Sequence, residues 1–91
     1  MQLTLLGTGC PSVDYKRFGP ANLVSSKKSH LLVDCGSGVT QRLKQAEVST
    51  ANIDALILTH LHSDHVVDFY QLIISSWHSY RIKPWKIYGP Q

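Results

Sequence analysis

Three histidines and one aspartate follow a short apolar run of the chain. The run covers residues 55–58, and the polar residues after it are His60, His62, Asp64 and His65. Imidazole nitrogens and carboxylate oxygens are the ligands that zinc and other first-row divalent ions prefer. A single histidine at a strand end is commonly a surface residue, but three of the chain's five histidines in one cluster are hard to explain in that way. The cluster therefore predicts a metal centre.

The spacing of the cluster indicates how its members divide between two ions. Side chains alternate between the faces of a strand, so His60 and His62 share a face if the strand continues through them. Asp64 follows at the same spacing, whereas His65 breaks the alternation and points elsewhere unless the backbone turns. We expect two adjacent metal ions, one bound by His60 and His62 and the other by Asp64 and His65.

The composition is that of a globular protein. The chain has 91 residues, of which 43% are hydrophobic and 16% charged, and its formal net charge is +3. These values argue against a disordered chain, and the mild positive charge helps an anionic substrate to approach without indicating nucleic-acid binding. The length allows one small domain or part of a larger one.

Two cysteines, Cys10 and Cys35, are too few for a disulfide framework. We expect both to be small thiols buried in a protein of a reducing compartment. No stretch approaches the ~20 apolar residues of a membrane span, and the first residues lack the features of a signal peptide. The expected location is the cytoplasm, with no membrane association.

The apolar pattern predicts an alternation of strands and helices. Strands are expected at residues 2–6, 21–26, 30–34, 55–58 and 85–88, and helices at 39–46 and 66–77. Ser37 is the expected N-cap of the first helix. This order predicts a layered α/β sheet.

Each predicted helix has an apolar face. In the first helix, the expected buried residues are Val39, Leu43 and Ala46, and the expected solvent-facing residues are Gln41, Arg42, Lys44 and Gln45. In the second helix, the expected core stripe is Val66, Phe69, Tyr70, Ile73, Ile74 and Trp77.

Residues 60–65 resemble the HxHxDH signature of the metallo-β-lactamase superfamily. Three further segments resemble its ribonuclease Z and arylsulfatase-like branch: LLGTG at residues 5–9, LVDCG at 32–36 and IYGP at 87–90. Two details are more similar to the arylsulfatase-like members, namely residues 17–24 and Ser63, since ribonuclease Z proteins more often have glycine at the latter position. Gly36-Ser37-Gly38 also departs from the acidic Gly-Glu-Gly of ribonuclease Z, which weakens the case for tRNA 3′-end processing.

The resemblance implies a metallo-β-lactamase-like layered α/β sheet, the N-terminal half of an αββα sandwich. It implies that His60 and His62 bind the first metal and that Asp64 and His65 bind the second. It also implies that Asp64 orients or deprotonates the attacking water, while Asp34 braces a loop near the site. The ions implied are zinc, with manganese or iron as alternatives, because these ligands accept all three.

The function implied is a dizinc phosphodiesterase similar to ribonuclease Z, in which a metal-held hydroxide attacks a phosphodiester and tRNA is one candidate substrate. Arylsulfatase-like or other ester hydrolysis is the first alternative. Four ligands leave each ion two protein donors where a catalytic zinc usually has three, and His30 and His78 are expected to be ordinary surface residues. We therefore expect residues 1–91 to be an incomplete N-terminal portion, with little activity alone. A second alternative is an inactive metal-binding or interaction module that pairs its sheet edge with another copy as a homo-oligomer.

Overall fold

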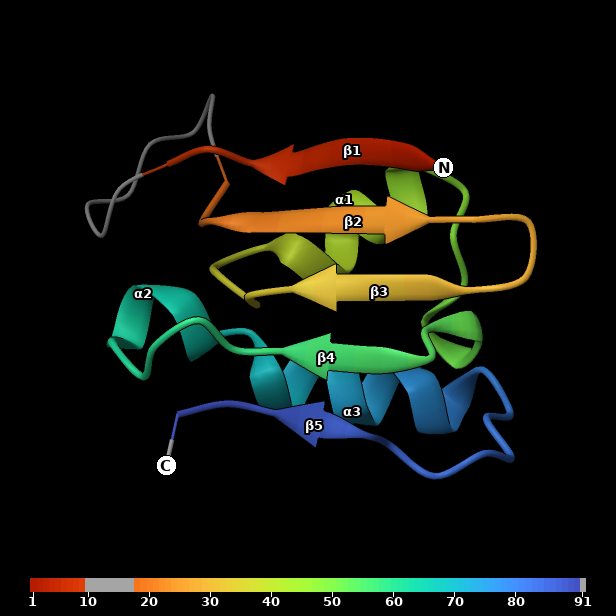
Figure 1. The fold of residues 1–91 in the computed structure, drawn as a ribbon. Helices are drawn as coiled ribbons and strands as arrows, with labels where there is room; N and C mark the ends of the chain where they lie inside the picture. The colour runs from red at the N-terminus through yellow and green to blue at the C-terminus, as the bar shows by residue number, and fades with distance from the viewer. Residues whose placement is uncertain (10–17, 91) are drawn as a thin grey trace.

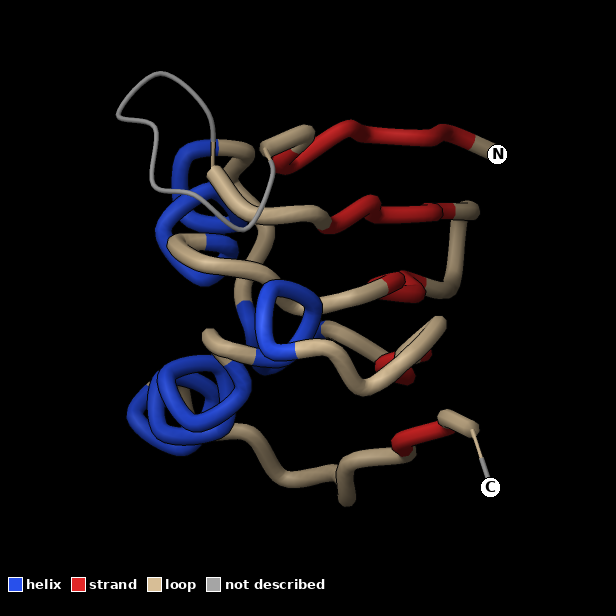
Figure 2. Tube along the Cα trace, turned by 90° about the vertical axis from the view of Figure 1, so that its left-hand side faces the viewer, coloured by secondary structure: helices blue, strands red, loops and turns tan. Residues whose placement is uncertain are grey.

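A five-stranded sheet carries helices on one of its faces (Figure 1, Figure 2). The structure is a computed structural model that describes residues 1–9 and 18–90. The strands lie side by side in chain order: β1 (Gln2–Gly7), β2 (Ala21–Ser25), β3 (His30–Val33), β4 (Ala55–Ile57) and β5 (Ile87–Tyr88). The helices are α1 (Val39–Gln45), the 3-10 helix η1 (Thr50–Asn52), α2 (Ser63–Val66) and α3 (Phe69–His78). The predicted layered α/β sheet is confirmed.

The direction of the strands changes across the sheet. β1, β2 and β3 pair antiparallel, whereas β3, β4 and β5 pair parallel. Parallel neighbours need a crossover connection, and these crossovers contain α1 and η1 before β4, then α2 and α3 before β5. The carboxyl ends of β3, β4 and β5 therefore meet at one edge, which is where open α/β sheets bind their ligands.

The core lies between the sheet and the helices. Leu23, Leu32 and Leu56 project from three neighbouring strands toward the helices, and each is almost completely buried together with Leu43 and Leu72 of the helices. Apolar burial of this kind is the main favourable term in folding.

The opposite face of the sheet is bare in Figure 2. Leu5, Ile57 and Tyr88 alternate with the core residues and therefore project from this face. Leu5 and Tyr88 are 58% and 57% exposed, and no element within residues 1–9 and 18–90 covers them. The described residues thus form one sheet with one helical layer.

Helix α1 buries two of the three residues predicted for its apolar face. Val39 and Leu43 are fully buried, but Ala46 is exposed because the helix ends one residue earlier, at Gln45. The prediction that Arg42 faces solvent is also wrong. It is half-buried, and its Nε donates a hydrogen bond of 2.7 Å to the Leu6 carbonyl, which ties α1 to the end of β1.

The predicted N-cap of α1 is also wrong. Gly38 occupies the N-cap position with a left-handed φ of 77°, and no side chain at that position caps the helix. The Asp68 carboxylate replaces the cap, because its Oδ2 accepts hydrogen bonds from the Thr40 N–H at 2.8 Å and from the Thr40 hydroxyl at 2.6 Å. A free N–H of the first helical turn is thus satisfied by a residue distant in sequence.

The single helix predicted for residues 66–77 is interrupted: Val66 ends α2, and α3 begins at Phe69. Half of the predicted core stripe is also wrong. Tyr70 and Trp77 are 78% and 73% exposed, and Ile74 is 51% exposed. The buried residues of α3 are instead Leu72 and Ser76, with Phe69 and Ile73 half-buried.

Contacts from the segment after α3 explain why a serine is buried there. The Trp85 Nε1–H donates a hydrogen bond of 3.0 Å to the Ser76 hydroxyl, and the Arg81 guanidinium lies 3.8 Å from the centre of the Trp85 ring. Arg81 also donates to the carbonyls of Thr50 at 3.1 Å and Ile53 at 2.7 Å. This cluster joins the chain that enters β5 to the chain that enters β4.

No helix among the described residues is both long enough and apolar enough to cross a membrane.

Replacement of Asp68 by alanine is expected to lower the free energy of unfolding by about 1–3 kcal/mol, because the Thr40 N–H and hydroxyl lose their acceptor. Asp68→Asn keeps one carbonyl acceptor and should lose less. Urea denaturation of both variants measures the difference. Equal stability of Asp68→Ala and the wild type would contradict the assigned cap.

Candidate metal centre

The strand that leads to the histidine cluster ends earlier than predicted. β4 stops at Ile57, and although the Leu58 N–H still donates to the Tyr88 carbonyl at 2.7 Å, the Thr59 N–H donates to Oδ1 of Asp34 at 2.8 Å. A side chain thus replaces the neighbouring strand as acceptor, and the regular ladder stops. The prediction that His60 and His62 lie on one face of a continuing strand is therefore wrong.

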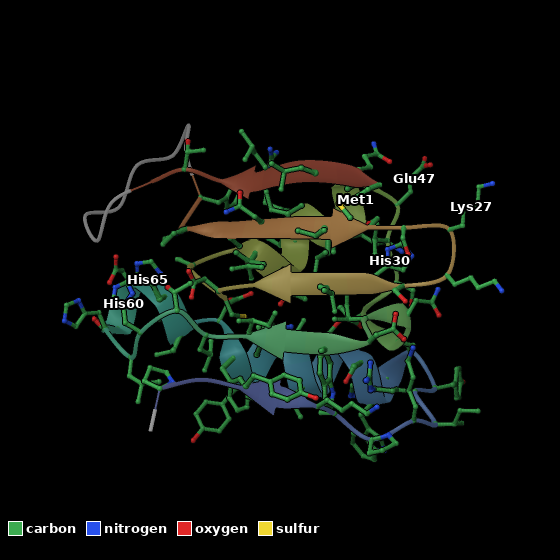
Figure 3. All side chains as sticks on the ribbon, viewed as in Figure 1. Met1, Lys27, His30, Glu47, His60 and His65 are labelled. Carbon is green, nitrogen blue, oxygen red and sulfur yellow. The ribbon has the colours of Figure 1, made fainter. Side chains whose placement is uncertain are left out.

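A backbone turn brings the predicted ligands together by another route. His62 is the extended N-cap of α2, and the His65 N–H donates to the His62 carbonyl at 2.9 Å. The ring centres of His60 and His65 are 3.9 Å apart, and those of His60 and His62 are 4.7 Å apart. Figure 3 shows His60 and His65 next to each other at one end of the sheet.

Asp64 and His65 lie in the single turn of α2 and face each other. Oδ2 of Asp64 is 3.4 Å from Nε2 of His65. Two ligands on a tetrahedral ion with bonds of about 2.0–2.2 Å lie roughly 3.3–3.6 Å apart, so the separation of this pair is compatible with a shared ion.

Within residues 1–9 and 18–90, no group of three or more His, Cys, Asp and Glu side chains has the arrangement of a metal site. The chemistry of the four side chains, imidazole and carboxylate, fits divalent ions that take their other ligands from elsewhere.

Asp34 connects the end of β3 to this cluster. It has a left-handed φ of 64°, which aspartate tolerates better than most residues, and its N–H donates to the Ile57 carbonyl at 2.8 Å. Its carboxylate accepts hydrogen bonds from the N–H and the hydroxyl of Thr59, and Oδ2 lies 2.9 Å from Nδ1 of His65. That last contact has the distance of an ion pair, although its alignment falls short of a hydrogen bond.

The surroundings of Asp34 keep its carboxyl group ionised. Burial alone raises the pKa of this group, but the hydrogen bonds from Thr59 and the close ring of His65 outweigh burial and hold the pKa below its usual value. An ionised carboxylate only accepts hydrogen bonds. Asp34 is therefore an acceptor between the loop after β4 and helix α2.

Cys35 is buried as predicted, and it belongs to the core. Its N–H donates to the His65 carbonyl at 2.8 Å, and its own carbonyl accepts from the Asp68 N–H at 3.1 Å. Burial, with the nearby carboxylates of Asp68 and Asp34, raises the pKa of the thiol to about 12. Cys10 lies outside the described residues.

The other two histidines are not part of the cluster. Nδ1 of His30 lies 2.8 Å from the Ser25 hydroxyl, and Figure 3 shows His30 at the end of the sheet opposite to His60 and His65. His30 is half-buried, so it is less exposed than predicted, whereas His78 is exposed at the end of α3.

Sequence reasoning did not single out Thr59, Thr40 or Asp68. The signal for Thr59 was its place directly before the first histidine of the cluster. The pairing of Thr40 with Asp68 leaves no signal in a single sequence, because 28 residues separate the two.

The family can now be assigned. A family model described as “Anti-Pycsar protein Apyc1” matches residues 1–91, which is the whole chain. The chain belongs to this family.

Relatives of this Apyc1-family chain include proteins named ribonuclease Z. The one from Mycobacterium bovis (strain BCG / Pasteur 1173P2) is 47% identical over 77 residues, which cover 85% of this chain and 28% of the relative. The one from Mycolicibacterium gilvum (strain PYR-GCK) is 45% identical over 93 residues, which cover 99% of this chain and 32% of the relative. The chain thus spans about a third of the length of these relatives.

Solved structures show the same fold. The metallo-β-lactamase fold protein YhfI from Bacillus subtilis superposes with a TM-score of 0.84 at 31% identity, over 96% of this chain and 35% of that protein. The short form of human tRNase Z superposes with a TM-score of 0.87 at 31% identity, over 99% of this chain and 34% of that protein. The predicted metallo-β-lactamase-like fold is confirmed for this Apyc1-family chain.

The thiol of Cys35 is expected to be inert in the folded protein because it is fully buried. In a Cys10→Ser variant it is the only thiol, so a colorimetric thiol reagent should label the chain only after guanidinium is added. Rapid labelling of the native variant would contradict the burial of Cys35.

Proposed function

We propose that residues 1–91 provide part of the metal centre of a metal-dependent hydrolase similar to ribonuclease Z, which cleaves phosphodiesters. One observation carries this proposal: His60, His62, Asp64 and His65 gather at the carboxyl end of β4. The first two would hold one ion and the last two a second, with zinc as the preferred metal and manganese or iron as alternatives.

The side chains of this chain would divide the work of the reaction between them. Two bound divalent ions supply a nucleophile from water at neutral pH and stabilise charge on a phosphoryl oxygen. Asp64 would orient the attacking water and accept its proton, because it is the carboxylate among the four residues of the cluster. Asp34 would hold the ring of His65 in place from the other side, where their closest atoms are 2.9 Å apart.

The names of the relatives support a phosphodiester substrate. Proteins named ribonuclease Z and tRNase Z share the fold and 31–47% of the aligned residues, so tRNA is one candidate substrate. The net charge of +3 suits an anionic partner. Because the chain spans about a third of these relatives, the activity and the substrate of the whole protein are part of the proposal.

Hydrolysis of a sulfate ester or another small ester, as in arylsulfatase-like proteins, is the second candidate. Two observations favour it: Ser63 lies within the cluster, and Gly36-Ser37-Gly38 carries no acidic residue.

The open sheet face supports the proposal that residues 1–91 are the N-terminal portion of a longer domain. Leu5, Ile57 and Tyr88 on this face are the kind of apolar residues that a second layer covers. Further polypeptide would cover the face in a complete cytoplasmic enzyme, whereas a second copy would cover it in a homo-oligomeric, inactive module.

Replacement of His62 by alanine should reduce the bound metal from about two ions per chain to about one, because one ion loses half of its donors from this chain. The side chain is exposed, so the circular dichroism spectrum should stay unchanged. Elemental analysis of the purified protein measures the metal, and His78→Ala, at another exposed histidine, is the matched control. Unchanged metal content in His62→Ala would refute the site assignment.

Hydrolysis of bis(p-nitrophenyl) phosphate by the metal-loaded protein should be slow, because each ion has two donors from this chain, but it should exceed hydrolysis of p-nitrophenyl sulfate. A chelator should abolish the activity, and added zinc should restore it. The reverse order of substrates would favour the second candidate, and no hydrolysis by a protein with two ions bound would favour the inactive module.

A further inference from the structure

We propose that Thr59 is a positioning residue, whose hydroxyl connects Asp34 to His60 so that one carboxylate sets the ring tautomer of both His60 and His65. This inference rests on the proposed function, because it assigns these residues a role at the same metal centre. It adds a residue that does not touch a metal ion itself.

The Thr59 hydroxyl lies between the carboxylate and the ring. Its Oγ1 is 2.8 Å from Oδ2 and 3.0 Å from Oδ1 of Asp34, and 3.0 Å from Nδ1 of His60. The Thr59 N–H holds the same carboxylate at 2.8 Å, so the backbone fixes the hydroxyl in this place.

The available protons determine which atom donates in each contact between Asp34, Thr59 and His60. The Thr59 hydroxyl is the donor in its contacts with both carboxylate oxygens of Asp34, so its single proton is committed to that carboxylate. The hydroxyl can then only accept from His60, which requires a proton on Nδ1 of that ring. In the neutral ring, Nε2 of His60 is left with the free lone pair that a metal ion needs.

The same carboxylate acts directly on the second ring. Nδ1 of His65 is 2.9 Å from Oδ2 of Asp34, whereas Nε2 faces Asp64. The carboxylate at Nδ1 is the nearer of the two, so the proton is favoured on Nδ1, which again leaves Nε2 free. Asp34 therefore orients one histidine of each predicted ligand pair. It acts directly on His65 and through Thr59 on His60. Figure 3 shows these two histidines next to each other at one end of the sheet.

Two substitutions separate the hydroxyl from the rest of the side chain. Thr59→Val keeps the shape but removes the hydroxyl, whereas Thr59→Ser keeps the hydroxyl. Both keep the backbone N–H that donates to Asp34. Thr59 is exposed, so neither change leaves a cavity in the core.

The test is nitrogen NMR of the imidazole rings in metal-free protein, at a pH where the spectrum itself shows neutral rings. The wild type and Thr59→Ser should carry the proton of His60 on Nδ1. In Thr59→Val, His60 should become a mixture of both tautomers while His65 stays unchanged. A wild-type His60 with its proton on Nε2, or a Thr59→Val spectrum equal to that of the wild type, would overturn the inference.

A zinc titration provides the second measurement. Thr59→Val should bind one of the two ions about 10–100-fold more weakly, the usual loss when the hydrogen-bond partner of a ligand is removed, while Thr59→Ser binds both as the wild type does. Equal affinity in Thr59→Val would count against the inference. A wild type that binds no zinc would refute the proposed function, and the tautomers would still decide the role of Thr59.

Discussion

The arrangement at the carboxyl ends of the strands depends on one buried carboxylate, that of Asp34. An ionised carboxylate removed from water costs several kcal/mol unless other donors replace the water. Here the N–H and the hydroxyl of Thr59 replace it, with the His65 ring on the other side. Those donors belong to the loop after β4 and to α2, so satisfying the carboxylate also places the segments that carry the predicted ligands.

Backbone hydrogen bonds extend this arrangement into the helical layer. The N–H and carbonyl of Cys35 pair with His65 and Asp68, and the Asp68 side chain caps α1 through Thr40. The ligand cluster is therefore linked to β3, β4 and α1 by contacts between groups that are distant in sequence. These hydrogen bonds explain why the side chains of the cluster keep fixed positions although they lie in a loop and a single helical turn.

The sequence predicted what depends on local pattern and missed what depends on distant partners. Alternation and composition indicated the strands and the layered fold, and the cluster from His60 to His65 indicated the site. The break before α3 was not predictable, because there the Asp68 N–H donates to the carbonyl of Cys35, a residue distant in sequence, and not within a helix. The apolar periodicity of α3 pointed to Tyr70 and Trp77, but Trp85, which lies outside the helix, contacts the buried Ser76 instead.

The order of strands in the sheet has a consequence for the folding pathway. The pairing of β2 with β3 joins residues only a few positions apart, as in Ser25 and His30, whereas β3 with β4 joins Leu31 to Ala55 and β4 with β5 joins Leu56 to Ile87. Closing a long loop costs more chain entropy than closing a short one, and nonlocal pairing is slow. We therefore expect the β2–β3 hairpin to form early, and the loop with the predicted ligands to become ordered only when the parallel strands join it.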